Sequence, residues 1–348
     1  MKNGWAESFG LVVILVAAID LAGCGSATNP SPVYINTAPA TVAYVNGSIA
    51  AGIAGYSTDP ANNGSLVRLL TLPPSPLYYG GPLATDPSGQ IYVAAGDGTN
   101  HAPQILIYPP NSIGAATPSR TINVNDASWL AVDPAGRVYV CTLPAGWTTG
   151  APMTVAVYAA GASGTATPLR TLVLRNVFPP ITDIVADAAG NIYIAGYIGN
   201  GWSVAVYPPT ANGPSTPART IDFGAGTFLV YGVAVNPAGN IFVNVAFNGD
   251  NNYNNSSFIE EFAPGASGLA TPINTIDLGA VSPWQIAGGG PVRLDGAGNI
   301  FTSVQLEEPT GQNVIVFYGY APDAVGDAKP TVQIAPPNDG YNSFLALN

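Results

Sequence analysis

Few side chains in this sequence could carry out covalent chemistry. Its 348 residues include one histidine, His101, and two cysteines, Cys24 and Cys141. Nucleophilic triads need a general base, and zinc sites need several imidazoles or thiolates, so the composition argues against both. Neither a Gly-x-Ser-x-Gly motif nor a Cys-x-x-Cys motif occurs. We therefore expect no resident cofactor, and we favour a binding protein over an enzyme.

One segment has oxygen ligands at a spacing typical of calcium loops. Asp250, Asn252, Asn254 and Glu261 stand at positions 1, 3, 5 and 12 of an EF-hand-like pattern. Only two of these four ligands would be charged, and no flanking helices are expected. The alternative interpretation is a solvated, Asn-rich loop that holds no ion.

Aromatic side chains are the main candidates for ligand contact. In the repeats described below, each stands before a first strand or between a second and a third strand, which predicts that they share one face. The aromatic residues are Trp129, Trp147, Trp202, Trp284, Tyr79, Tyr231 and Tyr253. Asp183 is an acidic candidate on the same face. Flat rings bind sugars, peptide side chains or cations; the alternative is that they pack loops onto the core.

A repeat supplies the elements that would position these residues. A hairpin with an Asp/Asn-x-x-Gly turn recurs about every 50 residues, as in LAVDPAGRVYV at 130–140. The Asp or Asn side chain can hold the turn backbone, and the Gly adopts a positive φ. A strand, a Pro/Gly loop and a last strand follow, as in VYAAGASGTATPLRTL at 157–172. We expect the arginines that recur there to pair with backbone or carboxylates of the neighbouring unit; they are Arg120, Arg170 and Arg219.

Four strands in each repeated unit are typical of a β-propeller. Five units are complete. Residues 41–72 contain three strand patterns without a first strand, and residues 345–348 match the beginning of a first strand. The sequence thus predicts an all-β, six-bladed β-propeller of four-stranded antiparallel blades over 41–348, closed by the C-terminal strand joining the N-terminal blade. Closure would remove open sheet edges, and we expect a monomer.

The recurring hairpin, such as VAVNPAGNIFV at 233–243, resembles NHL repeats. It is also similar to the wider group of six-bladed propellers that contains the gluconolactonase-like proteins. The resemblance covers 41–348 and implies the fold, but this fold supports many chemistries. Gluconolactonase-like enzymes hold a divalent metal through a central Glu, Asn and Asp. No matching Glu stands near the beginning of a first strand here.

The N-terminal segment predicts where the protein is located in the cell. Residues 1–23 combine Lys2 with a short apolar run, too short for a membrane span, and are expected to be a signal peptide. The sequence Leu-Ala-Gly-Cys ending at Cys24 resembles the bacterial lipobox, which implies lipidation of Cys24. The alternative is an ordinary signal peptide with a coincidental cysteine. Residues 24–40 are rich in Pro and Ser and predict a flexible tether.

Charge narrows the range of partners. Nine basic and twenty acidic residues give a net charge of −11, which argues against nucleic-acid binding. We expect a lipid-anchored propeller of the bacterial cell envelope, on the outer membrane or cell surface. It would bind a saccharide, a peptide or an envelope protein through an aromatic-rich face at the central channel. The alternative is a lactonase- or glycosidase-like hydrolase that uses acidic residues near the channel, such as Asp183 or Glu307.

Overall fold

The computed structural model describes residues 42–46, 52–62, 64–72, 82–95, 103–143, 152–223, 228–247, 256–281, 285–307, 313–335 and 344–347. All of these residues belong to one compact unit, Ile35–Asn348. The predicted signal peptide, Cys24 and the tether lie outside the described residues. Within the described part of the chain, no helix is long and apolar enough to cross a membrane.

Five sheets are built mainly from strands that follow one another in the chain. The first two, in pairing order, are β4 (Leu83–Thr85), β5 (Ile91–Ala95), β6 (Gln104–Tyr108), β7 (Arg120–Asn123); and β8 (Trp129–Val132), β9 (Val138–Thr142), β10 (Thr154–Tyr158), β11 (Arg170–Leu174), β15 (Gly213–Ser215). The next three are β12 (Val177–Ala186), β13 (Ile192–Ile198), β14 (Gly201–Tyr207), β16 (Arg219–Asp222); β17 (Phe228–Val235), β18 (Ile241–Phe247), β19 (Ser256–Phe262), β20 (Asn274–Asp277); and β21 (Gln285–Leu294), β22 (Ile300–Glu307), β23 (Asn313–Tyr320), β24 (Val332–Ile334). A short 3-10 helix, Gly279–Val281, follows β20.

A further sheet combines both ends of the described chain. Its strands pair in the order β25 (Phe344–Leu347), β1 (Val42–Asn46), β2 (Gly52–Ser57), β3 (Leu66–Thr71). β25 runs antiparallel to β1, from the pair Ala43 and Leu347 to the pair Asn46 and Phe344. β25 also lies against β4 on one side and β21 on the other.

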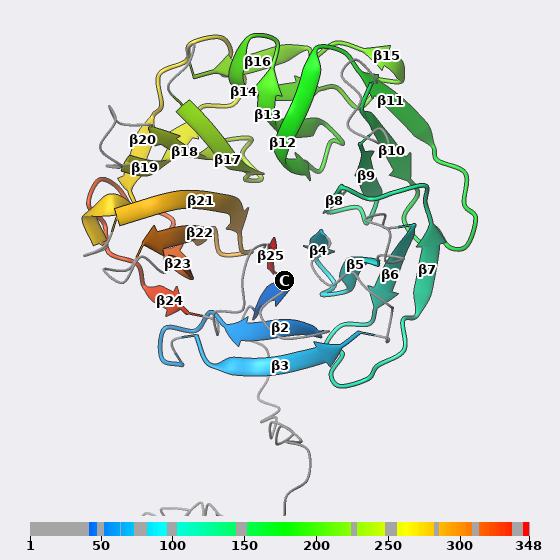
Figure 1. The fold of residues 1–348 in the computed structure, drawn as a ribbon, viewed down its shortest axis with the longest axis horizontal. Helices are drawn as coiled ribbons and strands as arrows, with labels where there is room; N and C mark the ends of the chain where they lie inside the picture. The colour runs from blue at the N-terminus through cyan, green and yellow to red at the C-terminus, as the bar shows by residue number, and fades with distance from the viewer. Residues whose placement is uncertain are drawn as a thin grey trace, which may run out of the picture. The chain divides into compact units, whose positions relative to one another are not determined.

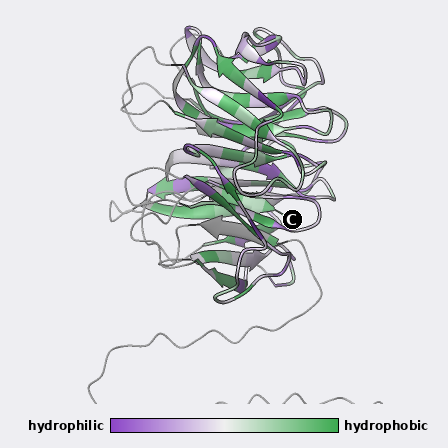
Figure 2. Cartoon of the chain, turned by 90° about the vertical axis from the view of Figure 1, so that its right-hand side faces the viewer, coloured by the Kyte–Doolittle hydropathy of each residue, from purple (hydrophilic) through white to green (hydrophobic). Residues whose placement is uncertain are grey.

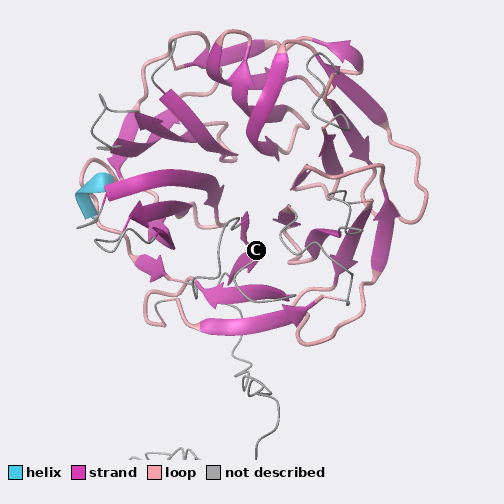
Figure 3. Cartoon of the chain, in the orientation of Figure 1, coloured by secondary structure: helices cyan, strands magenta, loops and turns pink. Residues whose placement is uncertain are grey.

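The sheets surround a common axis, with the first strand of each innermost and the fourth outermost (Figure 1). Strands make up almost all the regular structure in the same view (Figure 3). Neighbouring strands within a sheet are antiparallel, except that β15 joins β11 in parallel. The predicted all-β propeller with mostly four-stranded antiparallel blades is therefore confirmed.

The recurring Asp/Asn turns have the structural role that the sequence predicts. In one of them, Asp133 Oδ1 accepts hydrogen bonds from the backbone N–H groups of Ala135 and Arg137, each at 2.9 Å. Gly136 adopts a φ of +79°, which favours glycine. The hydroxyl of Tyr139 donates to Asp133 Oδ2 at 2.9 Å. The carboxylate thereby joins the turn to the strand that follows it.

The hydrophobic core lies between neighbouring sheets. One cluster, for example, joins Tyr139 and Leu172 of one sheet to Ile194 and Tyr207 of the next. The recurring aromatic residues predicted to pack between blades are all buried: Tyr108, Tyr158, Tyr207 and Phe262. Hydrophobic residues are accordingly concentrated along the strands in Figure 2.

The recurring arginines connect each outer strand to the next blade, which confirms their predicted contact with neighbouring backbone. The guanidinium Nη1 atoms donate to carbonyl oxygens as follows: Arg120 to Ala162 at 3.0 Å, Arg170 to Ala211 at 2.7 Å, Arg219 to Ala266 at 2.6 Å. Asn274 replaces the arginine in the next repeat, and its Nδ2 donates to Ala324 O at 3.0 Å. One polar contact therefore recurs at four successive blade boundaries.

Replacing Arg170 with alanine should destabilise the ring. Arg170 also donates to Gly190 O at 3.1 Å, so the change leaves two partly buried carbonyl groups without a donor. We expect a loss of about 1–3 kcal/mol in the free energy of unfolding, measured by urea denaturation. Arg170→Asn should lose less, because Asn274 already makes the equivalent contact. Equal losses in the two variants would contradict this assignment.

Candidate functional site

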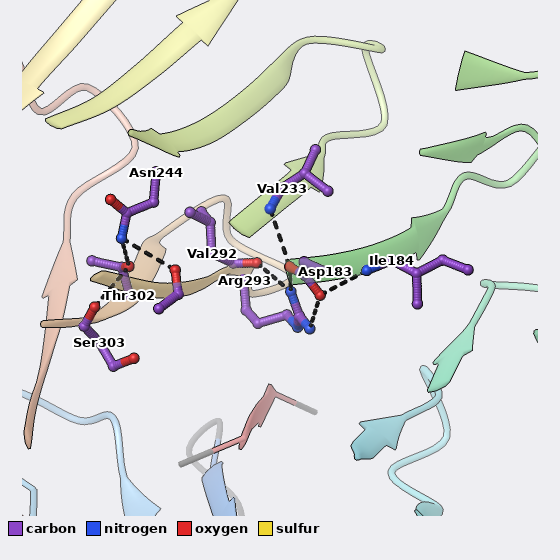
Figure 4. Close-up of polar contacts among 9 residues, drawn as sticks. Asp183, Ile184, Val233, Asn244, Val292, Arg293, Thr302 and Ser303 are labelled. Atoms are coloured by element: carbon purple, nitrogen blue, oxygen red, sulfur yellow. Dashed lines mark hydrogen bonds and ion pairs between the residues drawn. The ribbon is translucent and has the colours of Figure 1, made fainter. Parts of the chain in front are cut away.

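Three innermost strands meet around the buried carboxylate of Asp183 (Figure 4). Asp183 lies in β12 and is 4% exposed. Its Oδ1 accepts from the N–H of Ile184 at 2.9 Å, and its Oδ2 accepts from the N–H of Val233 in β17 at 3.1 Å. Arg293 of β21 donates to both oxygens, at 2.7 Å to Oδ2 and 2.9 Å to Oδ1.

This arrangement makes Asp183 part of the channel wall. Both carboxylate oxygens are engaged by the protein, and a fork-shaped guanidinium pairing of this kind is strong and directional. Asp183 was predicted as a ligand contact and, alternatively, as a hydrolytic acid. In the structure it joins three successive blades. Sequence reasoning missed Arg293, because a partner 110 residues away leaves no local signal.

A second buried polar group lies beside the ion pair. Asn244 donates through Nδ2 to Gly290 O at 3.1 Å and to Thr302 Oγ1 at 3.0 Å (Figure 4). Its Oδ1 accepts from the Ser257 hydroxyl at 3.0 Å. A fully satisfied buried amide of this kind specifies how the blades pack.

Tyr231 belongs to the same wall. The sequence placed it in a loop before a first strand, and this was wrong: it lies within β17, at the irregularity between Val230 and Gly232. A Cβ atom on Gly289 would stand 2.7 Å from Tyr231 Cδ2, so only glycine allows β21 to approach the ring. Burial raises the pKa of Tyr231, and a backbone hydrogen bond from Gly289 opposes that shift.

Replacing Asp183 with asparagine should strongly destabilise the protein. The change leaves the Arg293 guanidinium, whose side chain is 20% exposed, without its counter-charge. We expect a loss of about 3 kcal/mol in the free energy of unfolding, because breaking one half of a buried pair costs more than the pair contributes. A double variant, Asp183→Asn with Arg293→Met, should recover part of that loss in urea denaturation. Additive losses would argue against a coupled pair.

Trp202 lines a cleft of about 610 Å³ on the flank of the ring. The cleft is bounded by the β13–β14 hairpin, by β16 and by the segment that joins β11 to β12. The Trp202 ring meets the Tyr197 ring edge-on, with centroids 6.0 Å apart and an interplanar angle of 89°. A cleft of this size suits a small ligand of a few rings.

Polar groups accompany Trp202 in the cleft. Ser203 donates to Asp222 Oδ1 at 3.0 Å, which leaves Oδ2 of Asp222 free of hydrogen bonds from other described residues. Arg175 is exposed, and its guanidinium has no ion-pair partner among the described residues. Asn176 has a φ of +58° and adds an amide to the lining. Donors and acceptors thus surround one aromatic wall.

The position of Trp202 corrects the prediction of a single aromatic face at the channel. Trp202 lies in the third strand of its blade, one strand inside the outermost β16, and it pairs with Tyr197 in register. The predicted loop is reduced to Gly199 and Asn200. The third strand stands away from the axis, and Trp202, which also packs against the core between two sheets, lines the flank cleft.

The remaining predicted residues are not brought together with Trp202. Trp129 begins β8 and packs against the core between two sheets, outside the cleft lining. Glu307 ends β22 and is exposed. The other aromatic candidates lie outside the described residues: Trp147, Trp284, Tyr79 and Tyr253.

Glu261, the last residue of the calcium pattern, is occupied elsewhere. It lies in the extended strand β19, five residues beyond Ser256, and its Oε1 accepts from Asn240 Nδ2 at 2.7 Å. Asp250, Asn252 and Asn254 lie outside the described residues. Among the residues that the structure describes, no cluster of acidic, His or Cys side chains is arranged to hold a metal. Calcium binding at 250–261 stays a prediction.

Glu260 is a carboxyl group without a charged partner among the described side chains. It shares a face of β19 with Phe258 and Phe262, which pack into the core between two sheets. Burial raises its pKa. The folded state therefore holds the Glu260 proton more tightly than the unfolded chain does.

Replacing Glu260 with glutamine should stabilise the protein at neutral pH. A carboxyl with a raised folded pKa loses stability as the pH rises above its unfolded value of about 4.3, because the unfolded state gives up the proton first. The variant should therefore unfold at a higher temperature than the parent at pH 7, and the difference should shrink towards pH 4. Parallel melting profiles at every pH would refute this role for Glu260.

Solved structures share this fold. A protein of unknown function from Bacteroides caccae aligns with a TM-score of 0.58 and 10% identity, covering 88% of this chain and 99% of that chain. A luciferin-regenerating enzyme aligns with a TM-score of 0.51 and 12% identity, covering 84% and 91%. A calcium-binding regucalcin from Agrobacterium tumefaciens gives 0.44 and 12% identity, covering 82% and 85%. No protein-family profile and no curated sequence matches the chain. At these identities the likeness to the first two structures shows the fold alone.

Proposed function

We propose that this protein is a non-catalytic binding module of the bacterial cell envelope, and that its ligand is a saccharide held in the Trp202 cleft. One observation carries the proposal: the cleft combines the Trp202 ring with hydrogen-bonding groups that the protein leaves available. Sugars present apolar faces to aromatic rings and hydroxyl groups to amides and charged groups at their edges.

The charged groups of the cleft suit hydroxyl recognition. Arg175 offers only donors, whereas Oδ2 of Asp222 offers only an acceptor, so a pair of neighbouring hydroxyl groups can satisfy both. A peptide is the second candidate ligand for such a binding module. The cleft is lined by residues 175–176, 198–203 and 216–222, and so forms a compact pocket rather than an extended groove along a strand edge. We therefore favour the saccharide.

The scaffold in this proposal is a closed ring of six blades. The sheet that joins β25 to β1–β3 would be the sixth blade, with the C-terminal strand as its innermost member. Two observations support this arrangement. β25 lies against both β4 and β21, and a hydrophobic cluster joins Tyr56 and Leu345 of this sheet to Phe301 and Phe317 of the sheet before it.

The proposed localisation rests on the sequence. Cys24 would carry lipid after removal of residues 1–23, and residues 24–40 would connect the lipid to the propeller. The protein would then act as a monomer on the outer membrane or cell surface, with the membrane and a saccharide as its partners.

Replacing Trp202 with alanine should weaken saccharide binding about tenfold or more, because buried tryptophans at binding sites commonly contribute 2 kcal/mol or more. The measurement is a titration of the parent and the variant with a panel of neutral oligosaccharides, followed by calorimetry. Asp222→Asn should also weaken binding, since it removes the acceptor charge from the cleft.

Trp129→Ala is the matched control. Trp129, like Trp202, is a partly buried tryptophan that packs against the core between two sheets, but it lies outside the cleft. Its variant should lose stability and keep its affinity. Equal affinities of the parent and Trp202→Ala for every bound oligosaccharide would exclude the cleft as the binding site.

A further inference from the structure

We infer that the saccharide site continues from the Trp202 cleft over the tip of the β13–β14 hairpin to Tyr197. The ligand is then an oligosaccharide of at least two sugar units rather than a single sugar, and Tyr197 is the stacking surface of the second unit. The inference rests on the proposed function and deepens it, because it names the class of saccharide and a second binding residue.

Tyr197 is an exposed aromatic side chain beside the cleft. It is 37% exposed, and it is the only aromatic residue among the exposed large hydrophobic residues in the described part of the chain. Its hydroxyl forms no hydrogen bond with another described residue. A tyrosine presents an apolar body and a polar tip, so it can stack on the face of a sugar and hydrogen-bond to its edge.

The rings of Tyr197 and Trp202 cannot both stack on one sugar unit. They meet edge-on, with an interplanar angle of 89° and centroids 6.0 Å apart. A flat sugar ring that lies parallel to one of them is therefore perpendicular to the other. Two aromatic surfaces in this arrangement suit two neighbouring units of a chain, one on each ring.

The cleft already reaches both faces of the hairpin. Tyr197 and Trp202 pair across β13 and β14, and so lie on one face. Ser203 follows Trp202 directly and lies on the other face, where it pairs with Asp222 of β16. The lining of the cleft includes Trp202 from the first face and both Ser203 and Asp222 from the second. A ligand that contacts Asp222 and stacks on Tyr197 must therefore cross the tip of the hairpin, which takes more than one sugar unit.

The tip leaves room for this crossing. Gly199 and Asn200 form the turn, and both are exposed and line the cleft. A Cβ atom on Gly199 would meet no other atom within 4 Å. The N–H of Gly199 donates to Asn176 O at 2.7 Å, and β13 and β14 pair without a register shift. The surface under the ligand is thus ordered before binding, which lowers the entropy that binding costs.

The test measures affinity as a function of chain length. The parent protein is titrated by calorimetry with glucose, cellobiose, cellotriose and cellotetraose, and with the matching series of β-1,4-linked N-acetylglucosamine. We expect the affinity to rise about tenfold or more from the monosaccharide to the disaccharide or trisaccharide, because a further buried aromatic contact commonly contributes that much.

Three variants of Tyr197 separate its ring from its bulk. Tyr197→Ala should reduce the gain with chain length to about twofold or less, while its affinity for the monosaccharide stays within about twofold of the parent value. Tyr197→Phe is the matched control, which keeps the ring and should keep most of the gain. Tyr197→Leu keeps apolar bulk without a flat ring. It should behave as the alanine variant does, and it replaces that variant if urea denaturation shows that the alanine variant does not fold.

The outcomes distinguish this inference from the proposed function. An equal loss of affinity at every chain length would show that Tyr197 only supports Trp202, and it would overturn the inference while the proposed function stands. An unchanged gain with chain length in Tyr197→Ala and Tyr197→Leu would overturn it in the same way. Absence of binding by every member of both series would overturn the saccharide ligand and the inference together.

Discussion

Contact between neighbouring blades is the constraint on which this structure depends. Each blade has two apolar faces that must be buried against another element, and in this protein the neighbouring sheets bury them. The core of this protein accordingly consists of clusters that each draw on two sheets, with aromatic residues such as Tyr207 at their centre. An arginine that begins three of the six outermost strands then joins the periphery of one blade to the next. No blade completes its core without a neighbour.

The same constraint explains where a ligand can bind. Around β17 and β21 the inner strands approach so closely that a Cβ atom on Gly232 would stand 2.5 Å from Pro291 Cα. In this wall the Asp183 carboxylate is paired with Arg293, and the Asn244 amide is hydrogen-bonded within the protein. Among the described residues, Trp202 lines a cleft with available hydrogen-bonding groups on the flank.

Local patterns in the sequence determined the repeating unit. The alternating strands, the recurring turns such as the one at Asp133, and the contacts between blades such as the one at Arg170 were all predicted correctly. Each depends on residues within one repeat or at equal spacing in the next. Tertiary structure alone decided the site. Asp183 and Arg293 meet across three blades, and Trp202 points to the flank because of its place within a blade. Neither fact has a local signal, since both arise from how the ring brings distant strands together.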